Sequence, residues 1–193
     1  MACVTKGCIE WLRGRSALKS GESAARDRLE ETPYWHLARF GWSFQNSGRD
    51  PQRTVLSVSA GIEGDPDLND SPTPYSVTRR CDPKESVFEQ VRRARFPHRP
   101  SRLRALYVLD DYSLVVRALA EWFPSERRVV HECRLLVGSV VHRADAVWLD
   151  APRREWASNA EKYWGGVATE QPFPEVLVHG GIYFPRWEFF KQR

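Results

Sequence analysis

The sequence predicts one domain of the α+β class. Its 193 residues are 41% hydrophobic and include eight Trp, nine Phe and six Tyr, enough for the core of a single domain and too many for a disordered chain. Short β-branched and aromatic runs bounded by Gly and Pro are typical of strands. They are mixed with two or three stretches whose apolar residues recur at helical spacing, and this mixture indicates an α+β architecture.

The N-terminal part divides into an extension and the first elements of the domain. Residues 1–31 are charged, and we expect a helical or partly ordered extension there, followed by a domain at 32–193. The aromatic run PYWHLARF, residues 33–40, predicts the first strand. Loops are expected in two segments rich in Gly, Pro, Asn and Asp, 45–53 and 61–75, which flank a short strand or covering loop at 54–60.

The remaining elements follow from the spacing of apolar residues. Helices are predicted over three segments: 84–96, 112–123 and 152–164. Pro152 begins the third, and proline is tolerated in the first turn of a helix. Strands are predicted over four segments, 103–109, 128–136, 175–178 and about 182–190, and a strand or strand-loop is predicted over 140–149.

A lone carboxylate, Glu175, stands at the head of one of these strands, in PFPEVLVHGGI. Two prolines precede the strand and two glycines follow it. Such a β-branched strand is normally buried, and an ionised carboxylate is costly to bury without a partner. Glu175 therefore either faces solvent at the mouth of the strand or belongs to a site that needs it.

The segment before the strand at 103–109 is unusually basic. Six arginines lie within thirteen residues: Arg92, Arg93, Arg95, Arg99, Arg102 and Arg104. A solvated helix face is the ordinary explanation for such a run. Two prolines, however, restrict the chain just before Ser101 and Arg102, and a fixed Ser-Arg pair at a strand mouth is suited to hold a phosphate.

Two further motifs contain side chains able to do chemistry. In VVHRADAVWLD, His142 and Arg143 stand close to Asp145; an Arg143–Asp145 ion pair is the preferred interpretation, because no third ligand has metal spacing. Tyr163 and Trp164 end a helix before two glycines that read as its C-cap, and their rings serve either the core or a stacking platform. No metal site is expected.

The cysteines give no sign of a metal module or of secretion. Cys3, Cys8, Cys81 and Cys133 form no C-x-x-C, residues 1–30 carry no secretory signal, and no stretch reaches the length of a membrane span. We expect a cytoplasmic protein with reduced thiols and no membrane partner. An effector or toxin released without a signal has the same features.

The order of these motifs resembles the ADP-ribosyltransferase superfamily. A Tyr-x-His-x-x-Arg strand comes first, Ser-Arg before an aromatic strand follows, and EVLVHG comes late. The ending PEVLVHGGI is similar to the catalytic strand of toxins that modify DNA bases. Together, SRLRALYVLDD, SVVHRADAVWLD, AEKYWGG and EVLVHG resemble an uncharacterised bacterial family of this fold. The resemblance implies a split antiparallel β-sheet core with flanking helices that binds NAD.

The resemblance also implies roles for individual residues. Glu175 would be the catalytic carboxylate, stabilising the positive charge that develops as the nicotinamide–ribose bond breaks. His36 would hold the ribose or the nicotinamide amide, and Tyr107 would stack on the nicotinamide ring. Phosphates would be held by Arg39 and by Arg102 with Ser101 beside it. Substrate contacts are expected from four residues: His142, Arg143, Tyr163 and Trp164.

The chain departs from the arginine-modifying members of that superfamily. The S-T-S-like motif is missing, and Phe173 stands where those enzymes carry Gln or Glu. The resemblance therefore favours transfer of ADP-ribose to a DNA or RNA acceptor, as in a toxin or phage-defence effector, with an antitoxin or other protein as a further partner. The alternatives are an NAD hydrolase or RNA phosphotransferase of related fold, and a non-catalytic nucleic-acid-binding module.

Overall fold

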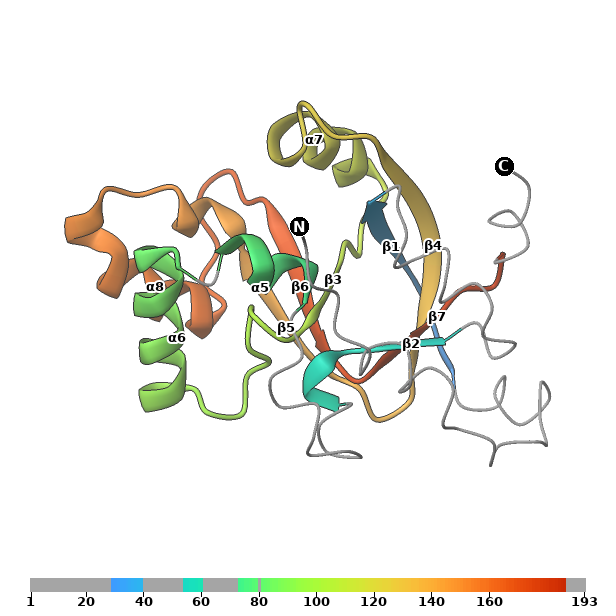
Figure 1. Cartoon of the computed structure of the whole chain (residues 1–193), viewed down its shortest axis with the longest axis horizontal. Helices are drawn as coiled ribbons and strands as arrows, with labels where there is room; N and C mark the ends of the chain where they lie inside the picture. The colour runs from blue at the N-terminus through green and yellow to red at the C-terminus, as the bar shows by residue number, and fades with distance from the viewer. Residues whose placement is uncertain (1–28, 40–53, 61–72, 80, 187–193) are drawn as a thin grey trace, which may run out of the picture.

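Two antiparallel sheets form the framework of the chain (Figure 1). The computed structural model describes residues 29–39, 54–60, 73–79 and 81–186. The first sheet has the order β1-β4-β7-β2, with strands at Leu29–Arg39, Arg128–Leu136, Gly181–Tyr183 and Thr54–Leu56. The second has the order β3-β6-β5, with strands at Leu106–Val108, Pro174–His179 and Val140–Asp145. The predicted α+β class is confirmed.

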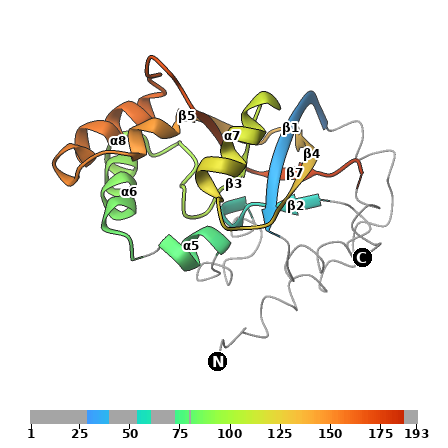
Figure 2. The same cartoon turned by 90° about the horizontal axis from the view of Figure 1, so that it is seen from above.

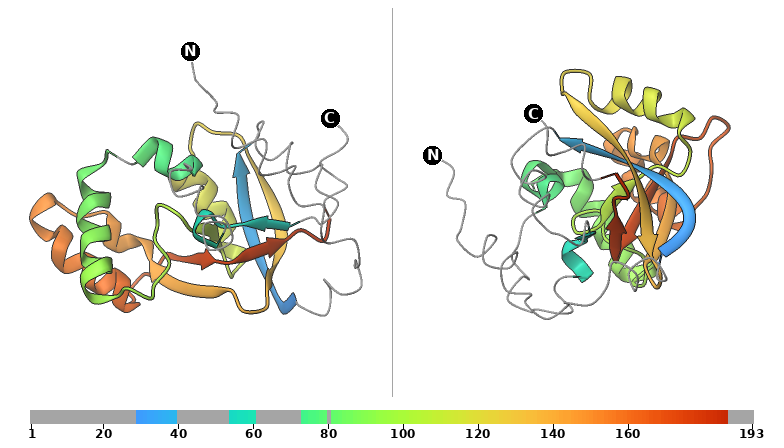
Figure 3. Two further views of the ribbon diagram at one scale, coloured as in Figure 1. Left: turned by 60° about the horizontal axis from the view of Figure 1, so that its bottom comes forward. Right: turned by 90° about the vertical axis from the view of Figure 1, so that its right-hand side faces the viewer.

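The two sheets are joined by the chain at two turns, from β4 into β5 and from β6 into β7, and by a bridge between backbones. The chain runs from β6 directly into β7 through Gly180, so one continuous segment belongs to both sheets (Figure 3). Gly180 has φ 140°, and a Cβ there would lie 2.9 Å from the Cα of Ser139, so a side chain does not fit. In the bridge, Trp35 of β1 and Leu109 after β3 exchange two backbone hydrogen bonds of 2.8 Å.

Helices cover the second sheet and one end of the first. Four labelled α-helices cover these regions, α5 at Pro74–Arg79, α6 at Pro83–Arg95, α7 at Ser113–Trp122 and α8 at Trp156–Gly165, and residues 58–60 are helical as well. Helices α6 and α8 pack side by side against the β3-β6-β5 sheet, whereas α7 lies near the end of β1 (Figure 2). Short 3₁₀ segments at Ala146–Leu149 and Arg153–Glu155 precede α8.

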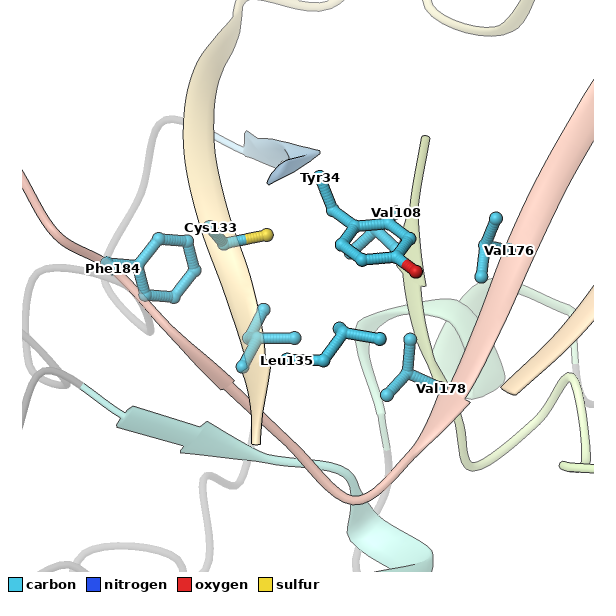
Figure 4. Packing of buried hydrophobic residues seen from close by; sticks show 8 residues of the cluster. Tyr34, Val108, Cys133, Leu135, Val176, Val178 and Phe184 are labelled. Atoms are coloured by element: carbon cyan, nitrogen blue, oxygen red, sulfur yellow. The ribbon is translucent and has the colours of Figure 1, made fainter. Parts of the chain in front are cut away.

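The central strand β6 is buried on both faces. Val176 and Val178 point toward the first sheet, where they pack with Tyr34 and Leu135 (Figure 4). Leu177 points the other way, into the layer formed by α6 and α8. Because side chains alternate along a strand, Glu175 lies on the same face as Leu177, beneath the helices.

Most predicted elements are confirmed, with several corrections. The helices expected at 84–96, 112–123 and 152–164 match α6, α7 and α8 with its preceding 3₁₀ turn. The loop expected at 61–75 is wrong at its end, because Pro74 begins α5. Strand β3 begins at Leu106 and not at residue 103, and β7 ends at Tyr183, well before residue 190. The strand part of the segment expected as a strand or strand-loop at 140–149 ends at Asp145, and the short strand expected within 54–60 covers Thr54–Leu56. The extension expected at 1–31 is wrong at its end, because β1 begins at Leu29 and not at residue 33. Residues 1–28 and the loop expected at 45–53 lie outside the described residues.

Within the described ranges, none of the helices combines the length and apolar character needed to cross a membrane. In the same ranges, no group of three or more His, Cys, Asp or Glu side chains is placed to hold a metal ion. Cys81 is exposed and Cys133 is buried, and both carry free thiols.

Candidate functional site

Glu175 is buried, and one of its two carboxylate oxygens is bound by protein side chains. It is the second residue of β6, opposite Ala144 of β5, and its exposed fraction is 5%. Its Oε1 atom accepts a hydrogen bond of 2.5 Å from the Tyr163 hydroxyl and forms an ion pair with Nη1 of Arg102. Of the two interpretations left open by the sequence, a carboxylate facing solvent is therefore wrong, and Glu175 belongs to a built polar site.

Arg102 is the shared partner of this site. It lies in the turn between α6 and β3 and is 4% exposed. Its Nε donates to Oε2 of Glu85 at 3.1 Å, and its Nη2 donates to the Tyr75 hydroxyl at 2.6 Å. Its Nη1 donates to Tyr163 at 2.7 Å as well as to Glu175. Burial is the largest influence on the pKa of Arg102 and lowers it, but Glu175 and the three surrounding tyrosines together outweigh burial and raise that pKa well above its ordinary value.

Three tyrosine rings surround the guanidinium. The Cζ atom of Arg102 lies 5.3 Å from the ring centre of Tyr75, 5.6 Å from that of Tyr107 and 5.2 Å from that of Tyr163, within the range of cation–π contacts. Burial raises the pKa of all three phenols, so each hydroxyl stays protonated and donates. We call the following six residues the Arg102 cluster: Tyr75, Glu85, Arg102, Tyr107, Tyr163 and Glu175.

The hydroxyls of the tyrosines complete the cluster. The Tyr75 hydroxyl donates to Oε1 of Glu85 at 2.5 Å, as the Tyr163 hydroxyl does to Glu175. The Tyr107 hydroxyl donates to the backbone carbonyl of Arg102 at 2.6 Å and so fixes the turn that carries the guanidinium. Arg102 thus lies between two Tyr–Glu pairs, one supplied by α5 and α6 and the other by α8 and β6.

His36 lies next to the cluster. Its Nδ1 donates to the carbonyl oxygen of Tyr107 at 2.8 Å, which connects β1 to the strand that bears this tyrosine. Burial is the largest cause of the lowered pKa of His36, so the ring is neutral near pH 7. Arg39 is the last residue of β1, and its side chain lies outside the described residues.

Ser101 faces an acidic side chain, which does not favour its expected role beside a phosphate. Its hydroxyl donates at 3.0 Å to Glu89, and the same carboxylate accepts from Arg92 and Arg93. A carboxylate at this position would repel a phosphate. Arg102 is also committed to protein partners, since each of its three nitrogens donates to a side chain of the cluster.

Two residues expected to contact substrate lie in the core. His142 is 2% exposed, stacks on Trp164 with ring centres 5.4 Å apart, and hydrogen-bonds through Nε2 to the carbonyl of Tyr163 at 3.1 Å. Burial lowers the pKa of His142 to about 4. Trp164 is completely buried and donates to the carbonyl of Phe88 at 2.8 Å. Of the two interpretations of the Tyr163 and Trp164 rings, core residues are therefore correct and a stacking platform is wrong.

The expected Arg143–Asp145 ion pair is wrong. Arg143 instead pairs with Asp110, with 2.6 Å between Nε and Oδ2, and contacts the hydroxyl of Tyr34 at 3.3 Å. The carboxylate of Asp145 accepts from three backbone N–H groups and a hydroxyl, those of Val147, Thr169 and Phe173. Asp145 therefore connects the end of β5 to the chain that returns into β6 just before Glu175.

Replacing Asp145 with asparagine is expected to lower the free energy of unfolding at pH 7 by about 1–3 kcal/mol, because the amide NH₂ would face a backbone donor. Burial raises the pKa of Asp145, but the hydrogen bonds from Thr169 and Phe173 outweigh it and lower that pKa overall. The carboxylate therefore stabilises the fold fully above its unfolded pKa of about 3.9, and this stabilisation is lost as the pH falls through the lower folded value. Urea denaturation at pH 7 and pH 3 should show the difference between the two proteins shrinking at the lower pH.

Asp150→Asn is the matched control for this experiment, since Asp150 is exposed. Its free energy of unfolding should stay within about 0.5 kcal/mol of wild type. An Asp145→Asn protein as stable as wild type at pH 7 would contradict the account of the carboxylate.

Sequence reasoning missed Tyr75 and Glu85. Tyr75 lies in a segment expected to be a loop, so its helical placement had no local signal. Glu85 occupies the first turn of α6, where an acidic residue is ordinarily explained by the helix dipole. It does, however, precede the buried Phe88 by three residues, and this i, i+3 spacing places both side chains on the buried face.

Residues 74–185 of the chain, more than half of its length, match the model of a protein family described as a protein of unknown function, DUF2441, and the chain belongs to this family. No curated protein matches the chain at a significant level. All six residues of the Arg102 cluster lie inside the matched range, whereas His36 and Arg39 precede it.

Proposed function

We propose that this DUF2441 member is an NAD-dependent ADP-ribosyltransferase with Glu175 as its catalytic carboxylate. One observation carries the proposal. Four residues that the sequence singled out, Arg102, Tyr107, Tyr163 and Glu175, come from a turn, a helix and two strands and meet in one cluster. The two antiparallel sheets joined at Gly180 support the split-sheet part of the same proposal.

The residue types suit cleavage of a nicotinamide–ribose bond. When this bond breaks, its electron pair goes to the ring nitrogen of nicotinamide, which leaves as a neutral molecule, and the ribose carbon gains positive charge. The Glu175 carboxylate stabilises that charge, and Tyr163 and Arg102 fix its position. The acceptor then bonds to the ribose carbon and gives up its proton to Glu175 or to water.

A nucleic-acid acceptor fits the basic segment. Arg93 and Arg95 are 71% and 57% exposed, and His98 and Arg99 are exposed in the turn that follows α6. The side chain of Arg92 is bound within the protein, because it donates to the carbonyls of Pro97 and Arg99 and so stabilises the turn. The exposed arginines, of which Arg93 and Arg95 also pair with Glu89 and Glu161, would attract a phosphate backbone, with strong dependence on salt. Action as a toxin or phage-defence effector, with an antitoxin as protein partner, belongs to this proposal.

The test offers NAD labelled in its adenylate phosphate to the full-length protein, with DNA, RNA and total protein as separate acceptor pools. We expect release of nicotinamide and transfer of the label to a nucleic-acid pool. Free labelled ADP-ribose with no modified acceptor would instead identify an NAD hydrolase. Salt-sensitive binding of oligonucleotides without any release of nicotinamide would overturn the proposal in favour of a non-catalytic binding module.

A further inference from the structure

The Arg102 cluster carries two carboxylates for one guanidinium. Glu85, Arg102 and Glu175 are 3%, 4% and 5% exposed. Within the described part of the chain, both carboxylates form their ion pair with Arg102 and with no other cation. The formal charge of the cluster is therefore one unit negative. Burying an uncompensated charge is costly, so a further positive charge brought to this cluster is stabilised.

The two most accessible members of the cluster are aromatic. Tyr75 and Tyr107 are half-buried, and their rings lie 5.1 Å apart at an angle of 39°. The other four members are buried. A ligand that approaches the cluster from solvent meets these two rings first. Aromatic faces attract cations and stack on flat groups, so the rings favour a planar cation over a compact one such as an ammonium.

Glu85 accounts for the excess charge. It occupies the Nε side of Arg102, while Glu175 meets Nη1 at the other end of the same guanidinium. Since the charge of Arg102 is divided between two carboxylates, Glu175 is less neutralised than it would be in a simple pair. Glu85 therefore acts on Glu175 through Arg102, without a direct contact between the two carboxylates in the described hydrogen bonds.

We propose that Glu85 is a positioning residue that makes the Arg102 cluster selective for a planar monocation, such as a pyridinium ring, over the neutral ring of the same shape. The inference rests on the proposed function in one respect, that the Arg102 cluster is the ligand site. It adds the residue that sets the charge preference and the charge class of the ligand.

The test compares 1-methylnicotinamide, a pyridinium cation, with neutral nicotinamide as probes of the full-length protein. Dissociation constants are measured by titration calorimetry or by ligand-detected NMR. We expect wild type to bind the cation about tenfold more tightly, which corresponds to about 1.4 kcal/mol. Glu85→Gln keeps a hydrogen-bond acceptor for Tyr75 and Arg102 but removes the excess charge, so it should bind both probes about equally.

Glu89→Gln is the matched control, because Glu89 lies one turn further along α6 and pairs with Arg92 and Arg93. It should keep the tenfold preference for the cation. The inference would be overturned if wild type bound both probes equally or did not bind the cation at all, and neither measurement depends on the folding of a variant. It would also be overturned if Glu85→Gln kept the full preference for the cation. ADP-ribosyl transfer without a cation preference would overturn this inference alone, whereas a cation preference without transfer would overturn only the proposed function.

Discussion

Replacing Arg102 with methionine is expected to lower the free energy of unfolding by about 3–5 kcal/mol, the cost typical of removing one partner from a buried ion pair. The change leaves two carboxylates, Glu85 and Glu175, buried without a counter-charge. The Tyr107 hydroxyl keeps its backbone partner, so the loss is confined to the guanidinium. Urea denaturation followed by circular dichroism measures the change, which should appear as a shift of the midpoint.

Arg154→Met is the control for this substitution, since Arg154 has a side chain that is 83% exposed and pairs only weakly with its neighbour Glu155. Its free energy of unfolding should remain within about 0.5 kcal/mol of wild type. A double variant, Arg102→Met with Glu85→Gln, should recover part of the loss because one buried carboxylate is removed. Equal stability of Arg102→Met and wild type would contradict the view that Arg102 neutralises the cluster.

The fold was predictable where the local pattern and the tertiary environment agree. Strand β4 was predicted over the residues it occupies, because its apolar and polar residues alternate well enough for a strand. Helix α6 was predictable from its spacing, and Asp82 caps it by accepting from the amide of Lys84 at 2.9 Å. The helix at α5 was not predictable, since Pro-rich segments ordinarily mark loops.

The sequence was enough to predict several residues of the site, but not which of these side chains contact one another. A carboxylate in a buried strand requires a cation, and the sequence named both Glu175 and Arg102 without pairing them. The partner of Arg143 could not be predicted from neighbouring residues. Asp110 lies 33 residues away in the sequence, whereas Asp145 is close and carries the same charged group. Asp145 is taken by backbone donors at 169 and 173, which only the tertiary return of the chain brings near.

Glu175→Gln is expected to abolish release of nicotinamide, with a rate loss of roughly 10²–10⁴-fold, while the fold is kept. The amide oxygen still accepts from Tyr163, but the negative charge that stabilises the ribose carbon is gone. Unlike the Arg102 variant, this one leaves Arg102 paired with Glu85, so the formal charge of the cluster becomes zero and the free energy of unfolding should not fall. Nicotinamide release and urea denaturation measured on the same preparation test both halves of the expectation.

Glu121→Gln is the control for the catalytic experiment, because Glu121 is a 51% exposed residue of α7 that pairs with Arg117. It should release nicotinamide at the wild-type rate. If Glu175→Gln also kept full turnover, Glu175 would be a structural partner of Arg102 and the catalytic proposal would fail. If Glu175→Gln lost both turnover and stability, the charge account of the cluster would fail, because Glu85 alone should suffice to neutralise Arg102. The two readouts together therefore separate a carboxylate that does chemistry from one that only holds an arginine in place.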